Sequence, residues 1–259
     1  MAAWQKVEDS AKVKSDAIKS GIERAPARAM LKATGRSEQD LAKPLIAVVN
    51  TWTDMTPCNA HLKELVVPLR DGIERAGGTV FEFNTVVVSD GITMGTEGMR
   101  ASLVSRETIA DSIELAVHGH SLDAVVVLVG CDKTIPAAAM ALARLDVPGM
   151  VVYGGSIMPG ELDGKALSIQ DVFEAVGARQ AGRIDDAELK AIEDHACPGA
   201  GACGGQFTAN TMAMALTALG LSPVGVNDIP ATDADKHQVL QALGHASLSW
   251  PTASNRADT

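Results

Sequence analysis

The sequence has few aromatic residues, no excess of positive charge and no long apolar run. Only 3% of its 259 residues are aromatic, so a core would be built from small aliphatic side chains between closely packed elements, which favours an α/β architecture. Lysine and arginine number 22 against 32 aspartates and glutamates, a net charge of -10. This acidic balance argues against nucleic acid and anionic membranes as partners.

Other absences narrow the class of protein further. The longest apolar stretches, such as 124–129, are much shorter than the roughly 20 residues of a membrane span, and residues 1–20 lack the apolar core of a signal peptide. We therefore expect a cytoplasmic protein. Walker A, HExxH and GxSxG motifs are missing, which sets aside the commonest phosphate-binding, zinc-protease and serine-hydrolase sites. A GxGxxG pattern at 199–204 follows a charged helical segment instead of a buried strand, so we do not read it as a dinucleotide site.

Short apolar runs alternate with amphipathic segments along the chain. Expected strands cover 44–50, 79–88, 124–129 and 150–153, and expected helices between them cover 61–76, 107–118 and 137–145, with a glycine-rich loop at 89–98. Two more helices are expected near 185–195 and 207–219. The order βαβαβαβ predicts an α/β fold: a parallel sheet flanked by helices on both faces, with its chemistry at the carboxyl ends of the strands.

The expected domain organisation has three parts. Residues 1–33 are rich in alanine, lysine and arginine and predict a helical arm, and 34–230 carry the α/β pattern. Residues 231–259 are expected to be a divergent or disordered tail, because 246–259 are polar and show no apolar period.

Thiols and carboxylates follow three of the expected strands. Cys58 lies after the first strand, Asp90 after the second, and Cys131 and Asp132 after the third. Because parallel strands end at one edge of a sheet, we expect these side chains to share that edge. Thiolates suit zinc or iron–sulfur clusters, whereas carboxylates, including that of Glu97, suit magnesium or manganese. Two adjacent metal sites of different chemistry are therefore expected.

The remaining cysteines lie in one glycine-rich segment. Cys197 and Cys203 are separated by five intervening residues and do not form a CxxC pair. Glycines on both sides of Cys203 suggest a backbone that bends tightly around a bulky group. We expect Cys197 to be a structural cysteine, because free cysteines are usually buried.

Eight segments of the chain, in order, resemble the dihydroxy-acid dehydratase and 6-phosphogluconate dehydratase family, and most resemble its dihydroxy-acid branch. The resemblance extends from about residue 25 to about 231 and covers the amino-terminal part of that family. The segments are 57–59 (PCN), 82–85 (EFNT), 88–91 (VSDG), 94–99 (MGTEGM), 105–107 (SRE), 130–141 (GCDKTIPAAAMA), 153–155 (YGG) and 197–205 (CPGAGACGG).

The resemblance implies two cofactors. It implies an iron–sulfur cluster bound by three cysteines, with [2Fe-2S] favoured over [4Fe-4S]: Cys58, Cys131 and Cys203. It also implies a Mg²⁺ ion with three ligands, of which the lysine would be carbamylated: Asp90, Asp132 and Lys133.

The implied reaction removes water from a small 2,3-dihydroxy acid and gives a 2-oxo acid, as in the branched-chain amino-acid biosynthesis of isoleucine and valine. Family members are considerably longer, and their second half supplies a β-rich domain and the expected catalytic base. The catalytic residue is therefore unknown in this chain, which we expect to be weak or inactive alone and to form a homodimer or associate with a carboxyl-terminal half. Alternatives are a sugar-acid dehydratase domain, a non-catalytic iron–sulfur or subunit-interaction fragment, and a zinc-bound structural domain.

Overall fold

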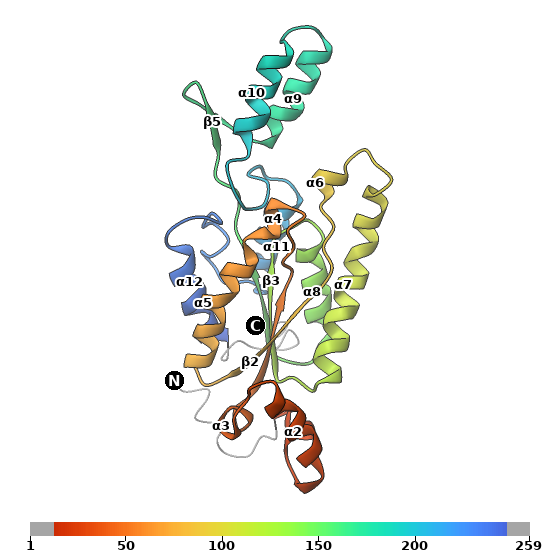
Figure 1. Cartoon of the computed structure of the whole chain (residues 1–259), viewed down its shortest axis with the longest axis vertical. Coiled ribbons are helices and arrows are strands. Elements are labelled where there is room, and N and C mark those ends of the chain that lie inside the picture. Colours follow the sequence, from red (N-terminus) through yellow and green to blue (C-terminus); the bar gives the residue numbers. More distant parts are fainter. Residues whose placement is uncertain (1–12, 248–259) are drawn as a thin grey trace.

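The computed structural model describes residues 13–247 and has a four-stranded parallel sheet at its centre, in the order β2-β1-β3-β4 (Figure 1). The strands of this sheet are β1 (Leu45–Asn50), β2 (Thr79–Asn84), β3 (Ala124–Val129) and β4 (Gly149–Tyr153). The principal helices around it are α5 (Leu62–Arg75), α7 (Met99–Gly119), α8 (Thr134–Arg144), α11 (Thr208–Ala218) and α12 (Lys236–Ser247).

Helices cover both faces of the sheet. Alternate side chains of the strands pack against α5 and α12 on one face and against α7, α8 and α11 on the other. Every residue of β1 and β3 is buried, because both strands are central and covered on both sides. The predicted fold class, a parallel sheet flanked by helices on both faces, is therefore confirmed.

The structure differs from the expected elements in length at two places. β2 ends at Asn84 instead of residue 88, because it is an edge strand that pairs only with β1, and β1 ends opposite it at Asn50. The helix expected from residue 107 begins at Met99, and the preceding glycine-rich loop contains the single turn α6 (Asp90–Thr93).

A small projection extends beyond the carboxyl ends of the strands (Figure 1). It consists of a β-hairpin, β5 (Gly160–Leu162) with β6 (Lys165–Leu167), and two helices, α9 (Ile169–Gln180) and α10 (Asp186–Ala196). Of these four elements, only α10 is expected from the sequence. The hairpin packs closely on α10: a Cβ atom on Gly160 would lie 1.8 Å from the carbonyl oxygen of His195.

The described part of the expected arm is helical. It comprises α1 (Asp16–Lys19), the 3₁₀ turn η1 (Ile22–Arg24) and α2 (Ala25–Ala33), and α3 (Glu38–Leu41) leads from it into β1. Residues 1–12 of the expected arm lie outside the described residues. No helix within the range 13–247 is long and apolar enough to cross a membrane.

The expected tail is corrected in its described part, because residues 236–247 form α12 and this helix belongs to the core. Leu240 and Leu243 of α12 are buried against α5. The two helices approach through glycines: a Cβ atom on Gly244 would lie 2.1 Å from the Leu69 carbonyl oxygen, and one on Gly72 would lie 2.0 Å from that of Gln241. A helix with so few apolar residues escapes a search for periodicity, since two glycines and close backbone contact replace larger side chains. Residues 248–259 lie outside the described range.

Candidate functional site

The site lies at the carboxyl ends of β1, β3 and β4, where the chain reverses the direction in which it adds strands. From β1 it passes through α5 to β2 on one side, and from β2 through α7 to β3 on the other, so the segments after β1 and β3 meet at the point where the strand order reverses. Cys58 lies in the short helix α4 (Pro57–Ala60) after β1, and Cys131 follows β3. Cys203 lies in the loop between α10 and α11.

The three thiols meet. Cys58 makes side-chain hydrogen bonds with both Cys131 and Cys203. These contacts with Cys131 and Cys203, followed by burial, raise the pKa of Cys58 far above its ordinary value. The same contacts lower the pKa of Cys131, and that of Cys203 to about 7. The opposite directions of these changes show that the three thiols form one interacting group.

The arrangement does not match a site for a single metal ion. No group of three or more histidine, cysteine, aspartate or glutamate side chains between residues 13 and 247 could hold such an ion as the side chains stand. Cys58 and Cys131 are 6% and 3% exposed, and Cys203 is partly exposed. Three adjacent thiols from three loops, two of them deeply buried, are nevertheless a soft donor set that fits a polynuclear iron–sulfur group.

Close backbone contacts hold the three cysteine loops together. A Cβ atom on Gly130, next to Cys131, would lie 2.1 Å from the carbonyl oxygen of Cys58, so only glycine allows these two loops to touch. The loop of Cys203 is attached to the same place, because the Gly201 amide donates to the carbonyl oxygen of Pro57 at 2.8 Å. Gly201 has a φ of +132°, which favours glycine.

A buried tyrosine and an asparagine support the Cys203 loop from below. Asn210 of α11 donates to the carbonyl oxygens of Cys203 and Gly205 at 2.9 and 2.8 Å. The Tyr153 hydroxyl donates to the Asn210 side-chain oxygen at 2.6 Å. Burial, together with negative charge on the three cysteines, raises the pKa of Tyr153, so its hydroxyl stays protonated and remains a donor.

A second group of charged side chains lies beside the thiols. Asp90, which is 6% exposed, accepts hydrogen bonds from the Lys133 amine at 2.5 Å and from the Ser102 hydroxyl. Burial raises the pKa of Asp90, but the hydrogen bonds from Lys133, Ser102 and Asp132 together outweigh it and lower that pKa. Burial, followed by the contact with Asp90, raises the pKa of Asp132 to about 6. Two carboxylates in contact make a position where a cation would be favourable.

The structure thus brings together all six residues that the resemblance implies as ligands of the two cofactors, although their roles as ligands remain predictions. It does not bring Glu97 to them: this side chain is exposed and pairs with Arg100. Cys197 is exposed and not buried as expected. Sequence reasoning missed Tyr153 and Asn210, because a single polar residue in an apolar segment gives no periodic signal.

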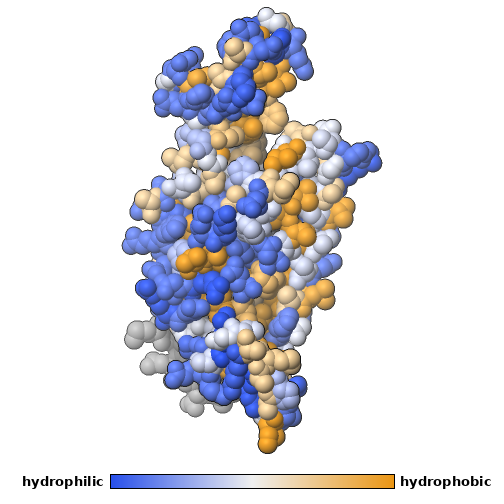
Figure 2. Space-filling view, viewed as in Figure 1, coloured by the Kyte–Doolittle hydropathy of each residue, from blue (hydrophilic) through white to orange (hydrophobic). Residues whose placement is uncertain are grey.

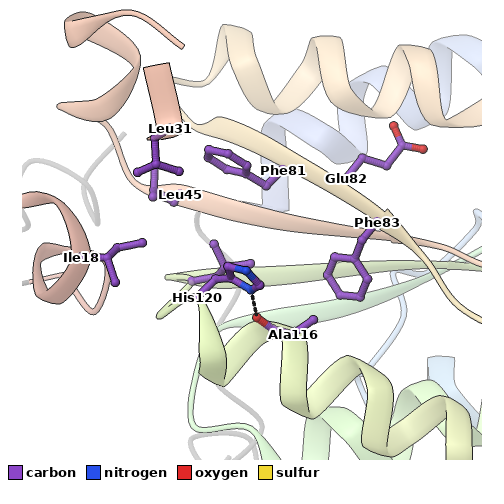
Figure 3. Close-up of a pocket in the computed structure, with 9 residues that line it drawn as sticks. Ile18, Leu31, Leu45, Phe81, Glu82, Phe83, Ala116 and His120 are labelled. Carbon is purple, nitrogen blue, oxygen red and sulfur yellow. Dashed lines mark hydrogen bonds between the residues drawn. The ribbon is translucent and has the colours of Figure 1, made fainter. Parts of the chain in front are cut away.

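A separate apolar hollow of about 300 Å³ lies at the opposite end of the sheet, near the amino end of β1 (Figure 3). It contains no cysteine and is far along the strands from the thiols, so it is not part of this site. The residues that line it are Ile18, Leu31, Leu45, Phe81, Glu82, Phe83, Ala116, His120 and Leu122.

Fold and site together define an α/β domain with a thiol cluster and a carboxylate–lysine group at one sheet edge. Residues 43–257 match the family model described as "Dihydroxy-acid/6-phosphogluconate dehydratase N-terminal". The chain belongs to this family.

Several relatives carry the name dihydroxy-acid dehydratase. One from Koribacter versatilis is 58% identical over 232 residues, which is 90% of this chain and 40% of the relative. One from Thermus thermophilus is 56% identical over 241 residues, which is 93% of this chain and 43% of the relative. One from Haloarcula marismortui is 48% identical over 236 residues, covering 91% and 41%. The chain therefore spans only about 40% of the length of these curated relatives.

Proposed function

We propose that the chain is the amino-terminal part of a hydro-lyase that converts a 2,3-dihydroxy carboxylic acid into a 2-oxo acid, as in branched-chain amino-acid biosynthesis. The observation that carries the proposal is the contact of three thiols beside the Asp90–Asp132–Lys133 group. The name shared by relatives that match nine-tenths of the chain supports the substrate class.

Three cysteines would bind an iron–sulfur cluster: Cys58, Cys131 and Cys203. Only Cys203 is partly exposed, so this side of the cluster is the side on which substrate would approach. The participation of Cys58 favours [2Fe-2S] over [4Fe-4S]. When bound, iron and Mg²⁺ would act as Lewis acids towards the hydroxyl groups and carboxylate of the substrate.

Three side chains would bind Mg²⁺: Asp90, Asp132 and Lys133. The charge of Asp90 helps to raise the pKa of Asp132, so the two carboxylates are close enough to repel each other when both are ionised, and a divalent cation would remove that repulsion. The Lys133 ammonium competes for Asp90 as it stands, 2.5 Å away. Carbamylation of its nitrogen would replace a competing positive charge with an additional oxygen ligand.

The residues of this chain would therefore bind the cofactors and orient the substrate, but they would not complete the reaction. The Cys203 loop, supported by Asn210 and Tyr153, fixes one wall of the site. We assign no residue of this chain as the base that removes the proton from carbon 2 of the substrate. Since the relatives are more than twice as long, we place that base in the part that they have in addition, and we expect weak or no turnover from this chain alone.

The test uses anaerobically purified chain with reconstituted iron and sulfide. We expect brown protein whose visible spectrum changes when a 2,3-dihydroxy acid is added, and 2-oxo acid formation only when a carboxyl-terminal part of a relative is supplied. Asp90→Asn should keep the colour and lose the spectral response to substrate. Asp111→Asn is the matched control, because Asp111 is exposed and pairs with Arg144 away from the thiols.

Each alternative has its own outcome. Brown protein without any response to substrate would indicate a non-catalytic iron–sulfur or interaction module. A spectral response only to sugar acids would indicate a sugar-acid dehydratase domain. Colourless protein with bound zinc would indicate a structural domain. Rapid turnover by the chain alone would contradict the assignment of the base to the additional part of the relatives.

The proposal includes association and location. Leu103, Val104 and Leu115 on α7 are 57%, 65% and 74% exposed, and apolar surface runs along this side of the molecule (Figure 2). Such a face supports a homodimer or association with a carboxyl-terminal half. The four free cysteines suit the reducing cytoplasm, where we place the protein.

A further inference from the structure

A fully buried lysine lies where the segment after α11 enters α12. We call residues 226–236 the strap; it ends at Lys236, the first residue of α12, whose side chain is 0% exposed. The Lys236 amine donates to the carbonyl oxygens of Val226 and Ile229 at 3.2 and 3.1 Å. Both acceptors lie within the strap, so Lys236 closes it into a compact loop.

Burial of this amine has a free-energy cost that its contacts must offset. Burial lowers the pKa of Lys236 to about 8, although the negative charge of Asp233 opposes the change. A methionine would fill similar space without this cost. An apolar side chain could not make the two hydrogen bonds. We therefore expect that the lysine stabilises the conformation of the strap.

The strap contacts the segment that follows β4. The Ala231 amide donates to the Ser156 carbonyl oxygen at 2.8 Å. Gly155 has a φ of +103°, and a Cβ atom there would lie 2.6 Å from the Ala231 nitrogen and 2.7 Å from the Ile229 oxygen. The strap therefore lies directly against the backbone of 155–156, with no side chain between them.

The segment 155–157 in turn holds the loop of the third cysteine. Ser156 and Ala202 form a parallel β-bridge. The Ala202 amide donates to the Gly155 carbonyl oxygen at 3.0 Å, and the Ile157 amide donates to the Ala202 oxygen at 2.7 Å. Cys203 is the next residue along the chain. A continuous path of backbone hydrogen bonds thus joins the strap to Cys203.

We propose that Lys236 is a positioning residue for Cys203: by closing the strap, it holds 155–157 and so fixes the third thiol against Cys58. The consequence for iron binding rests on the proposed function, whereas the position of the thiol does not. Loss of the two hydrogen bonds should release the strap and expose Cys203, while Cys58 and Cys131 stay fixed by the direct contact of their own loops at Gly130.

A control variant in the same helix distinguishes positioning of Cys203 from a general contribution of Lys236 to the stability of α12. Leu240 is also 0% exposed, belongs to the same helix and packs towards α5. Leu240→Ala should therefore weaken the helix packing without breaking the strap. Comparison of Lys236→Met with Leu240→Ala separates loss of the strap from loss of stability.

The experiment measures alkylation of each cysteine by iodoacetamide in the cluster-free protein, resolved by peptide mass spectrometry. We expect Lys236→Met to raise the rate at Cys203 on the order of tenfold and to leave the rates at Cys58 and Cys131 unchanged. Cys197, which is already exposed, is the internal reference. After reconstitution, Lys236→Met should lose iron to a chelator on the order of ten times more readily than Leu240→Ala.

An unchanged rate at Cys203, or an equal increase in Leu240→Ala, would overturn the proposal. If Lys236→Met does not fold, amide hydrogen exchange of the wild-type chain tests the proposal instead. The hydrogen bonds of the Ala231 and Ala202 amides should open with the same free energy. Much slower exchange at Ala202 than at Ala231 would contradict the proposal. Wild-type protein that binds no iron would refute the proposed function instead, and the thiol and exchange measurements would still test the strap.

Discussion

The substitution Gly130→Ala tests whether direct backbone contact holds the first two thiols together. The added Cβ atom would lie 2.1 Å from the Cys58 carbonyl oxygen and 3.0 Å from its carbonyl carbon. It would therefore be about 1.3 Å short of an ordinary contact of roughly 3.4 Å. Both partners are backbone atoms, so no side chain can turn away, and one of the two loops must move.

The expected cost follows from overpacking a close contact. It should lower the free energy of unfolding by about 1–3 kcal/mol, which is about 2–12 °C in Tm for a chain of this size. A loop displaced by about 1 Å would also separate the thiols of Cys58 and Cys131, so bound iron should decrease with stability. Urea unfolding of the cluster-free protein and iron analysis after reconstitution measure the two effects separately.

The matched control is Gly177→Ala in α9, where no heavy atom lies within 4 Å of the added Cβ atom. Because this glycine lies in a helix interior, the change to alanine should raise the free energy of unfolding by about 0.4–1 kcal/mol. The iron content should stay unchanged. If Gly130→Ala unfolds like the wild type and binds the same amount of iron, the reasoning from backbone contact is refuted.

Three further substitutions test other contacts. Gly244→Ala should reduce the stability to urea by about 1–3 kcal/mol, because α12 would be forced away from α5; an unchanged unfolding midpoint would show that α12 is not held as described. Asp123 accepts hydrogen bonds from the Ser15 amide and hydroxyl at 2.8 and 2.6 Å. Asp123→Ala should therefore lower the free energy of unfolding by about 1.5–3 kcal/mol and speed protease cleavage within 13–33. Equal cleavage rates in variant and wild type would show that Asp123 does not hold the amino-terminal helices. Asn210→Ala removes both hydrogen bonds to the Cys203 loop and should weaken iron retention on the order of tenfold; full retention in a chelator assay would show that this support is dispensable.

The sheet and the edge that carries the thiols could be predicted because they depend on local patterns. Fully buried parallel strands appear as continuous apolar runs, as in 124–129, and the residues after them share one edge whatever the details of packing. Cys58, Cys131 and Asp90 follow such strands, so their proximity could be predicted from the sequence alone.

The elements that escaped prediction depend on contacts between distant segments. α12 is attached through glycines at its contact with α5, and a glycine gives no apolar signal. Lys236 resembles an exposed lysine in the sequence, because its burial depends on two carbonyl groups presented by the folded strap. Cys197 resembles a buried thiol by residue type, but it lies at the end of α10 in the exposed projection.

The measurement that tests the central claim most directly is the iron and acid-labile sulfide content of four single variants reconstituted anaerobically beside the wild type. Cys58→Ser, Cys131→Ser and Cys203→Ser should each lose the cluster, and Cys197→Ser should retain wild-type content, because only its thiol lies outside the contact group. Full iron and sulfide content in any of the first three variants would contradict the assignment of these thiols as the ligands of one cluster.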